Sequence, residues 1–359
     1  MRSRLAIILA ALAAIALLGA LVESNRSSGA TATTTTTSTP DPNRVITARG
    51  PLPGAILIAD RGNNRLLLVD SHKHILWRFP SRADKARGEN LFFDDDTFVM
   101  PGGKELVVNE EDHQDILAIN IKTHRTRLLF GEPAVYGSDS HHMNWPDDAY
   151  VLPDGTLTVA DAYNCRILFI RHKRIVRQIG QTKVCYHNPP HTLQAVNGDT
   201  PAPNGGVLVS EIPPGGSWVD AFSKTGKLLW SFQAPVGYPS DPQPLSRGRI
   251  LLADYSRPGA VLILNHRGRV LWKYAPTSGP GELDHPSLAI MLPNGNIAVN
   301  DDMRHRVVII DPKTHRIVWQ YGNTDQPSTM PGYLHTPDGM DYIPLGPNEK
   351  PLWHLVHHP

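Results

Sequence analysis

The sequence predicts an all-β fold, a six-bladed β-propeller closed by a C-terminal strand and preceded by an N-terminal hydrophobic helix. Three observations carry this prediction. A short apolar strand that ends in an acidic residue recurs six times, each copy has room for four strands, and the chain ends on an orphan strand. Its 359 residues are 40% hydrophobic and include 29 Gly and 32 Pro, so the chain can bury a core that turns interrupt often.

The N-terminal segment points to export. Arg2 and Arg4 precede an uncharged apolar stretch over residues 5–22, which is long enough to span a bilayer. We interpret residues 1–24 as a signal anchor or a signal peptide, and residues 25–44 as a Thr-rich linker that cannot bury a core. The propeller over residues 45–359 is therefore expected outside the cytoplasm. It would be part of a single-pass membrane protein, or secreted if the leader is cleaved.

Each repeat has the pattern of one propeller blade. A turn such as the Pro-Asp-Gly at residues 153–155 joins two apolar runs into a hairpin. After the acidic residue come a loop, a third strand, a polar turn and a fourth strand that commonly contains Trp, as at Trp77 and Trp230. Four strands at this period are typical of a propeller blade. The acidic strand ends lie 43–51 residues apart, at Asp60, Glu110, Asp161, Glu211, Asp254 and Asp301.

The two ends of the body complement each other. The first repeat lacks a convincing inner strand, whereas residues 337–344 have the beginning of a repeat and no remainder. We therefore expect the C-terminal strand to complete the N-terminal blade, because a closed ring leaves no free sheet edge.

The loops that follow the acidic strand ends resemble the D-x-x-N-x-R element of NHL-repeat propellers. The resemblance is strongest at residues 60–65, 161–166 and 301–306, and it covers most of residues 54–344. It implies a six-bladed propeller. The fourth and fifth repeats replace the element, so their loops are expected to differ in shape. The fourth-strand pattern is also similar to pyrroloquinoline-quinone-type and arylsulfotransferase propellers, as a packing motif that implies no cofactor.

Each Asp and Arg of this element is interpreted as a structural pair that bridges its loop through a charge-assisted hydrogen bond. The fourth-strand Trp residues are interpreted as packing between blades. Cys165 and Cys185 are the two cysteines of the chain, and they fall in neighbouring loops of the third repeat. In an oxidising compartment we expect them to form a disulfide; two free thiols are the alternative.

The predicted topology separates the charges onto two faces. The hairpins between the third and fourth strands carry basic residues, as at residues 122–127 and 171–174. This face is suited to an anionic envelope surface, although solubilising turns explain it equally well. The net charge is only +1 and no aromatic residues interleave with these turns, so a nucleic-acid partner is not expected.

The opposite face gathers acidic residues and histidines, and we place the binding site there. The candidate ligand-binding residues are Asp95, Asp147, Asp148 and Asp338. The candidate metal ligands, for zinc or calcium, are His142, His191, His285 and His335. Histidines bonded to backbone or water are the competing interpretation of this set.

Two further resemblances bear on catalysis. Residues 190–193 are loosely similar to an opening in peptidylglycine amidating lyases, in which propeller histidines bind zinc. Residues 285–296 are similar to the arylsulfotransferase pattern, which implies a nucleophilic role for His285. The catalytic candidates are His285, His191, Tyr163 and Arg304.

We therefore expect an extracytoplasmic propeller that binds a ligand or a divalent metal as a binding or scaffold module. The alternative is a propeller enzyme, either a metal-assisted lyase or hydrolase or a relative of arylsulfotransferases. The sequence leaves open whether the protein is an enzyme.

Overall fold

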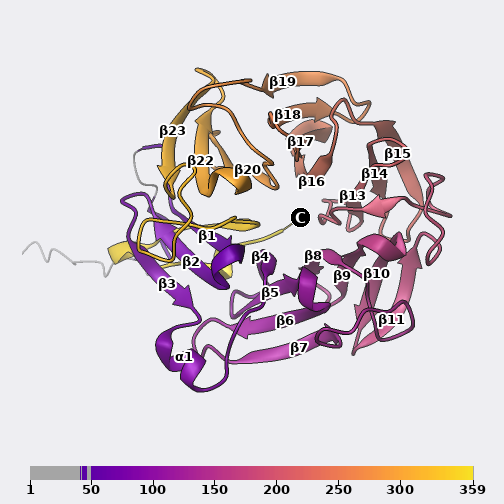
Figure 1. Cartoon of the computed structure of the whole chain (residues 1–359), viewed down its shortest axis with the longest axis horizontal. Helices are drawn as coiled ribbons and strands as arrows, with labels where there is room; N and C mark the ends of the chain where they lie inside the picture. Colours follow the sequence, from indigo (N-terminus) through magenta and orange to yellow (C-terminus); the bar gives the residue numbers. More distant parts are fainter. Residues whose placement is uncertain (1–40, 42, 47–49, 359) are drawn as a thin grey trace, which may run out of the picture. The chain divides into compact units, whose positions relative to one another are not determined.

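The computed structural model describes residue 41, residues 43–46 and residues 50–358, and within this part it has six four-stranded antiparallel sheets around a common centre (Figure 1). The predicted six-bladed propeller is confirmed. The predicted leader and most of the linker lie outside the described residues. Among the described residues, no helix is long and apolar enough to cross a membrane.

We number the blades one to six along the chain, and give their strands from the centre outwards. Blade one contains β24 (Met340–Ile343), β1 (Ala55–Asp60), β2 (Arg65–Asp70) and β3 (Ile75–Phe79). Blade two contains β4 (Asp94–Val99), β5 (Glu105–Glu110), β6 (Asp115–Asn120) and β7 (Thr126–Gly131). Blade three contains β8 (Pro146–Val151), β9 (Leu157–Asp161), β10 (Arg166–Arg171) and β11 (Arg174–Ile179).

Blade four contains β12 (Ala195–Val196), β13 (Val207–Ile212), β14 (Trp218–Phe222) and β15 (Leu228–Gln233). Blade five contains β16 (Pro239–Leu245), β17 (Arg249–Asp254), β18 (Ala260–Asn265) and β19 (Val270–Tyr274). Blade six contains β20 (Ala289–Met291), β21 (Ile297–Asp301), β22 (Arg306–Asp311) and β23 (Arg316–Tyr321). The helix α1 (Arg82–Ala86) connects blades one and two.

Ring closure follows the prediction. Strand β24 pairs antiparallel with β1, with Ile343 opposite Ala55 and Met340 opposite Ile58. The N-terminal blade is therefore completed by the C-terminal strand, and neither strand is left with a free edge on that side.

The core lies between neighbouring blades. The two middle strands of a blade are mostly apolar, and β1 and β2 are buried at every position because blades cover both of their faces. Leu57 and Val108 share one apolar cluster between blades one and two, and Leu208 and Leu252 share another between blades four and five. Apolar burial between blades therefore holds the ring together.

The outer-strand tryptophans also join blades, as predicted. Trp77 donates from Nε1 to the carbonyl of Ile121 at 3.1 Å, and Trp319 donates to the carbonyl of Ser71 at 3.0 Å. Each of these bonds crosses from one blade to the next.

The loop between the second and third strands has the same shape in four blades. It forms a 3₁₀ turn in η1 (Arg61–Asn63), η2 (Glu111–His113), η3 (Ala162–Asn164) and η5 (Asp302–Arg304). The predicted Asp–Arg pairs are present, with Arg65 Nε 2.6 Å from Asp60 and Arg306 Nε 2.6 Å from Asp301. Blades four and five have no such turn after β13 and β17, in agreement with their different loop sequences. Cys165 and Cys185 form the predicted disulfide.

The segment after β24 returns to the propeller centre, which was not predicted. Its residues Leu352 and Val356 are buried. The ring of His358 lies 5.5 Å from the rings of both Phe98 and Tyr150, and His358 Nε2 lies 3.1 Å from Asp341. The chain end is therefore packed against two inner strands.

Candidate functional site

The site begins with an irregularity that three inner strands share. The pairing of β4 with β5 shifts register between Asp94 and Thr97, and the pairing of β8 with β9 shifts between Pro146 and Ala149. The pairing of β16 with β17 shifts between Ser240 and Gln243. Such a bulge changes the direction of side chains that would otherwise alternate between the two faces of a strand. The bulges lie at Asp95 and Asp96, at Asp147 and Asp148, and at Asp241.

These carboxyl groups form two tiers. One oxygen each from Asp95, Glu111 and Asp147 lies within 4.8 Å of the other two, and we call these residues the upper triad. The lower triad consists of Asp96, Asp148 and Asp241, whose oxygens meet the same limit. All three residues of the lower triad are buried.

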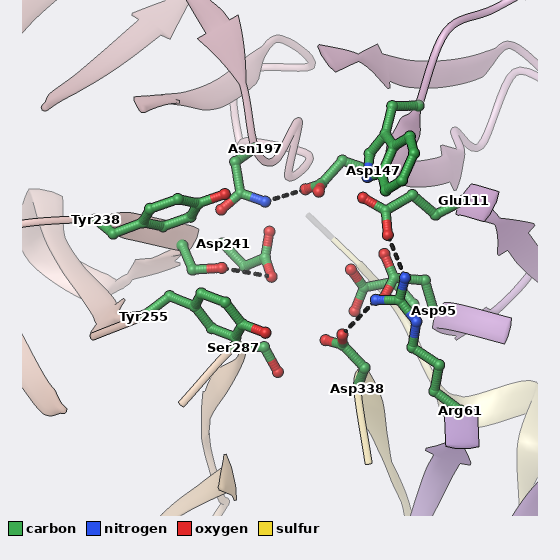
Figure 2. Close-up of a pocket in the computed structure, with 13 residues that line it drawn as sticks. Arg61, Asp95, Glu111, Asp147, Asn197, Tyr238, Asp241, Tyr255, Ser287 and Asp338 are labelled. Atoms are coloured by element: carbon green, nitrogen blue, oxygen red, sulfur yellow. Dashed lines mark hydrogen bonds and ion pairs between the residues drawn. The ribbon is translucent and has the colours of Figure 1, made fainter. Parts of the chain in front are cut away.

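A cavity of about 200 Å³ lies on the face of the loops between second and third strands, and Asp96 and Asp241 of the lower triad are part of its lining. Figure 2 shows Arg61, Asp95, Glu111, Asp147 and Asp338 on one side of it, facing Tyr238, Tyr255 and Ser287 on the other. We call this cavity the central pocket. Its lining includes six carboxyl groups and one guanidinium group: Asp95, Asp96, Glu111, Asp147, Asp241, Asp338 and Arg61. The two tyrosines and Trp145 add aromatic surface.

Arg61 is the cation that the fold itself supplies. It is the first residue of η1, and its guanidinium contacts Asp95 at 3.0 Å, Asp338 at 2.9 Å and Glu111 at 2.5 Å. The side chain of Arg61 is 18% exposed, so these ion pairs are largely shielded from solvent. Arg61 therefore compensates part of the upper triad, and its contacts do not include a residue of the lower triad.

Burial dominates the titration of this site. It raises the pKa of Glu111 to about 7 against the opposing charge of Arg61, and it raises the pKa of Asp148 to about 7. Burial, reinforced by Asp241 and Asp148, raises the pKa of Asp96 well above its usual range. Of the carboxyl groups that line the pocket, Glu111 is therefore poised to exchange a proton near neutral pH.

The predicted ligand-binding residues come together. Asp95, Asp147 and Asp338 line the central pocket, and Asp148 lies beneath it in the lower triad. The sequence-based prediction placed all four on this face, and the structure brings them to its centre.

The four predicted metal-binding histidines do not come together. His142 pairs with Glu132 and Asp139 in a surface loop, and His191 is exposed. His285 contacts its neighbour Asp284 at 2.6 Å, and the ring of His335 lies 5.4 Å from that of His305. In the part of the chain that the structure describes, none of the four belongs to a group with metal-ligand spacing.

The catalytic candidates lie around the pocket rather than in it. Tyr163 is 53% exposed and packs beside Trp145, and Arg304 is held by Asp325 and by the carbonyl groups of Gly279 and Glu282. The ring of His285 lies 4.9 Å from that of Tyr255, so it supports a pocket residue from behind. None of these candidates lines the central pocket.

A positional signal in the sequence points to pocket residues that the site prediction left out. Arg61, Glu111 and Tyr255 each directly follow the acidic residue that ends the second strand of their blade. The same position of each repeat lies at a similar place relative to the propeller centre, so these three side chains converge although their chemistry differs. Alignment of the repeats at the acidic residue would have found them.

Comparison with known proteins supports the fold. Residues 177–333 match the family described as outer membrane protein assembly factor BamB. A search of the curated proteins gave no significant match. A protein of unknown function from Bacteroides caccae is 19% identical, with a TM-score of 0.54, over 80% of this chain and 97% of that chain.

A second similar structure is a chain in a nidogen–laminin complex, 12% identical with a TM-score of 0.55 over 80% of this chain and 97% of that chain. Identities this low show a shared fold alone. The resemblances to NHL-repeat, amidating-lyase and arylsulfotransferase propellers stay predictions. The chain is therefore similar over residues 177–333 to the family described as outer membrane protein assembly factor BamB, and similar in fold to these two solved structures over 80% of its length.

Proposed function

We propose that this protein is an exported, membrane-tethered binding propeller whose central pocket takes a small organic cation. The composition of the pocket carries this proposal. Six carboxyl groups converge there on one guanidinium group, and a positively charged ligand would favour the ionised forms that burial disfavours. The N-terminal segment supplies the tether, with the propeller outside the cytoplasm.

The aromatic side of the pocket supports the same ligand class. Tyr238 and Tyr255 face the carboxylates across the cavity (Figure 2). Their hydroxyl groups point into the cavity (Figure 2), so an ammonium or guanidinium group there can pair with the carboxylates and donate hydrogen bonds to the tyrosine hydroxyls. A cavity of about 200 Å³ accommodates a small molecule of a few heavy atoms rather than a polymer.

A second candidate function is acid–base catalysis. Glu111 has a pKa raised to about 7 by burial, and it lies beside Asp147 at the pocket wall. A carboxyl group that titrates near neutral pH is suited to proton transfer. Turnover of a bound cation that is lost in Glu111→Gln, with binding retained, would favour this function over binding alone.

The test of the binding function is calorimetric titration of the full-length chain with putrescine, agmatine and choline at neutral pH and low salt. The neutral 1,4-butanediol and the anionic succinate serve as control probes that lack a positive charge. We expect binding of at least one of the cations, and at least roughly tenfold weaker binding in Asp338→Asn, which removes one pocket charge.

The matched control is Asp154→Asn. Asp154 lies in the turn between β8 and β9, at the other end of the blade, so its loss should leave the affinity unchanged. Binding of succinate or butanediol in preference to every cation, or an unchanged affinity in Asp338→Asn, would contradict the proposed function.

A further inference from the structure

We propose that the lower triad of Asp96, Asp148 and Asp241 is a binding site for one Ca²⁺ ion in the propeller channel, beneath the central pocket. This inference goes beyond the proposed function, because the ion would be a constituent of the ring, and the organic cation a ligand of the pocket above it.

The ligand atoms of the triad have suitable spacing. One carboxylate oxygen from each residue lies within 4.8 Å of the other two. Oxygens bound to one Ca²⁺ at about 2.3–2.6 Å can lie at most about 5 Å apart. The three carboxylates come from β4, β8 and β16, which belong to blades two, three and five. Each is directed inward by the bulge of its own strand.

Buried polar atoms at the triad have no partner, which is the second observation for a cation. Oδ1 of Asp96 and Oδ1 of Asp241 accept no hydrogen bond from the described residues, and each of these residues is only 3% exposed. The hydroxyl group of Tyr150, which is 1% exposed, is unpartnered among the same residues. The charges of all three aspartates contribute to the raised pKa of Tyr150, so its hydroxyl lies close to them. A buried carboxylate without a partner is costly unless it binds a cation or a proton.

Two glycines explain why the protein supplies no partner to these oxygens. A Cβ atom at Gly198 would lie 2.7 Å from Oδ1 of Asp241, and one at Gly339 would lie 2.7 Å from Oδ1 of Asp96. Each unpartnered oxygen therefore faces a backbone that carries no side chain. The space around the triad is kept for the carboxylates and for whatever they bind.

The upper triad does not meet the same condition. Asp95 and Glu111 already contact the guanidinium of Arg61, so a protein cation occupies that position. The lower triad has no contact with Arg61. The guanidinium of Arg61 thus compensates the carboxylates of the upper triad, and a metal ion compensates those of the lower triad.

The oxygen ligands of the lower triad indicate which metal ion it would bind. The triad offers three carboxylates and no imidazole or thiolate, which favours a hard cation over zinc. Mg²⁺ demands a near-ideal octahedron and keeps several waters, whereas Ca²⁺ accepts irregular sets of oxygens. Ligands fixed on three separate blades form an irregular set, so we assign Ca²⁺.

The test uses the full-length chain after treatment with a chelator, titrated with CaCl₂ and with MgCl₂ by calorimetry and by thermal unfolding. We expect one Ca²⁺ per chain, weaker binding of Mg²⁺, and a Tm that rises by roughly 5 °C at saturating Ca²⁺ because the ion binds only the folded ring. Asp148→Asn and Asp241→Asn should each weaken Ca²⁺ binding at least roughly tenfold.

The Tm of the metal-free Asp148→Asn and Asp241→Asn variants distinguishes loss of a calcium ligand from misfolding. Replacing one of three crowded carboxylates should raise the Tm of the metal-free protein while removing its response to Ca²⁺. Asp154→Asn is the control, and it should keep the affinity of the wild-type chain for Ca²⁺.

Lack of Ca²⁺ binding at millimolar concentration, tighter binding of Mg²⁺, or wild-type affinity in both Asp148→Asn and Asp241→Asn would overturn the calcium site. Asp96 and Asp241 belong to both sites, whereas Asp148 belongs to the triad and does not line the central pocket. Asp148→Asn therefore distinguishes failure of the calcium site from failure of the organic-cation pocket.

Discussion

Replacing Arg61 with Met should destabilise the propeller more than any substitution of a single exposed charge. The guanidinium makes ion pairs with Asp95, Glu111 and Asp338 at 2.5–3.0 Å, and the side chains of these three acids are 6%, 7% and 10% exposed. Surface ion pairs contribute about 0–1 kcal/mol, whereas loss of one partner from a buried pair costs about 3–5 kcal/mol. Since Arg61 is only 18% exposed, we expect a loss of about 3–5 kcal/mol.

The loss should depend on pH in a defined direction. Arg61 stabilises the ionised forms of Asp95 and Glu111, and it opposes the burial that raises the pKa of Glu111 to about 7. Below that pKa the carboxyl group of Glu111 is protonated and gains little from the guanidinium. The difference between wild type and Arg61→Met should therefore be full at pH 8 and smaller at pH 5.

Urea unfolding at both pH values measures this difference. Arg61→Lys is the informative second variant, because an ammonium group keeps the charge but cannot form the same forked contacts, so it should recover part of the loss. A loss below about 1 kcal/mol at pH 8, or an equal loss at pH 5, would refute the assignment of Arg61 as the internal cation of the upper triad.

Three further predictions concern the ring and its titration. Burial raises the pKa of Asp148 from the ordinary 3.8 to about 7, so the free energy of unfolding of the metal-free protein should fall by roughly 4 kcal/mol through this group as the pH rises from 4 through 7. Urea unfolding measures this change, and saturating Ca²⁺ should reverse the trend. A free energy of unfolding that rises with pH in chelator would contradict the prediction. Arg306→Met leaves Asp301 buried without its partner and should lower the free energy of unfolding by about 3–5 kcal/mol. The double variant Asp301→Asn/Arg306→Met should recover part of this loss, and additive effects of the two substitutions would argue against the pair. The double variant Cys165→Ser/Cys185→Ser opens a loop of 20 residues and should lower the free energy of unfolding by about 3 kcal/mol, while reductant should have no effect on that variant.

The blades were predictable because their signals are local. Each hairpin turn, strand-ending acid and loop arginine lies within one repeat, so periodicity alone placed them, and the orphan strand before Pro344 indicated how the ring closes. The C-terminal segment that places His358 against Phe98 was not predictable, since it belongs to no repeat.

The site was only partly predictable because its geometry depends on departures from regular strands. In a regular strand, neighbouring residues such as Asp147 and Asp148 point to opposite faces, so nothing in the alternation indicates that both reach the channel. The register shift between Pro146 and Ala149 brings them there. The histidine prediction rested on side-chain chemistry, since His142 and His191 lie in loops whose path the sequence does not specify.

We expect the carboxylates at the centre of the propeller to bind a cation in exchange for protons. Calorimetric titration of the metal-free chain with CaCl₂ at pH 7, in two buffers of different ionisation enthalpy, counts those protons directly. Because the pKa of Asp148 is raised to about 7, and that of Asp96 well above its usual range, we predict one Ca²⁺ bound per chain with the release of at least one proton. Binding without a difference between the two buffers, or no binding, would contradict the account.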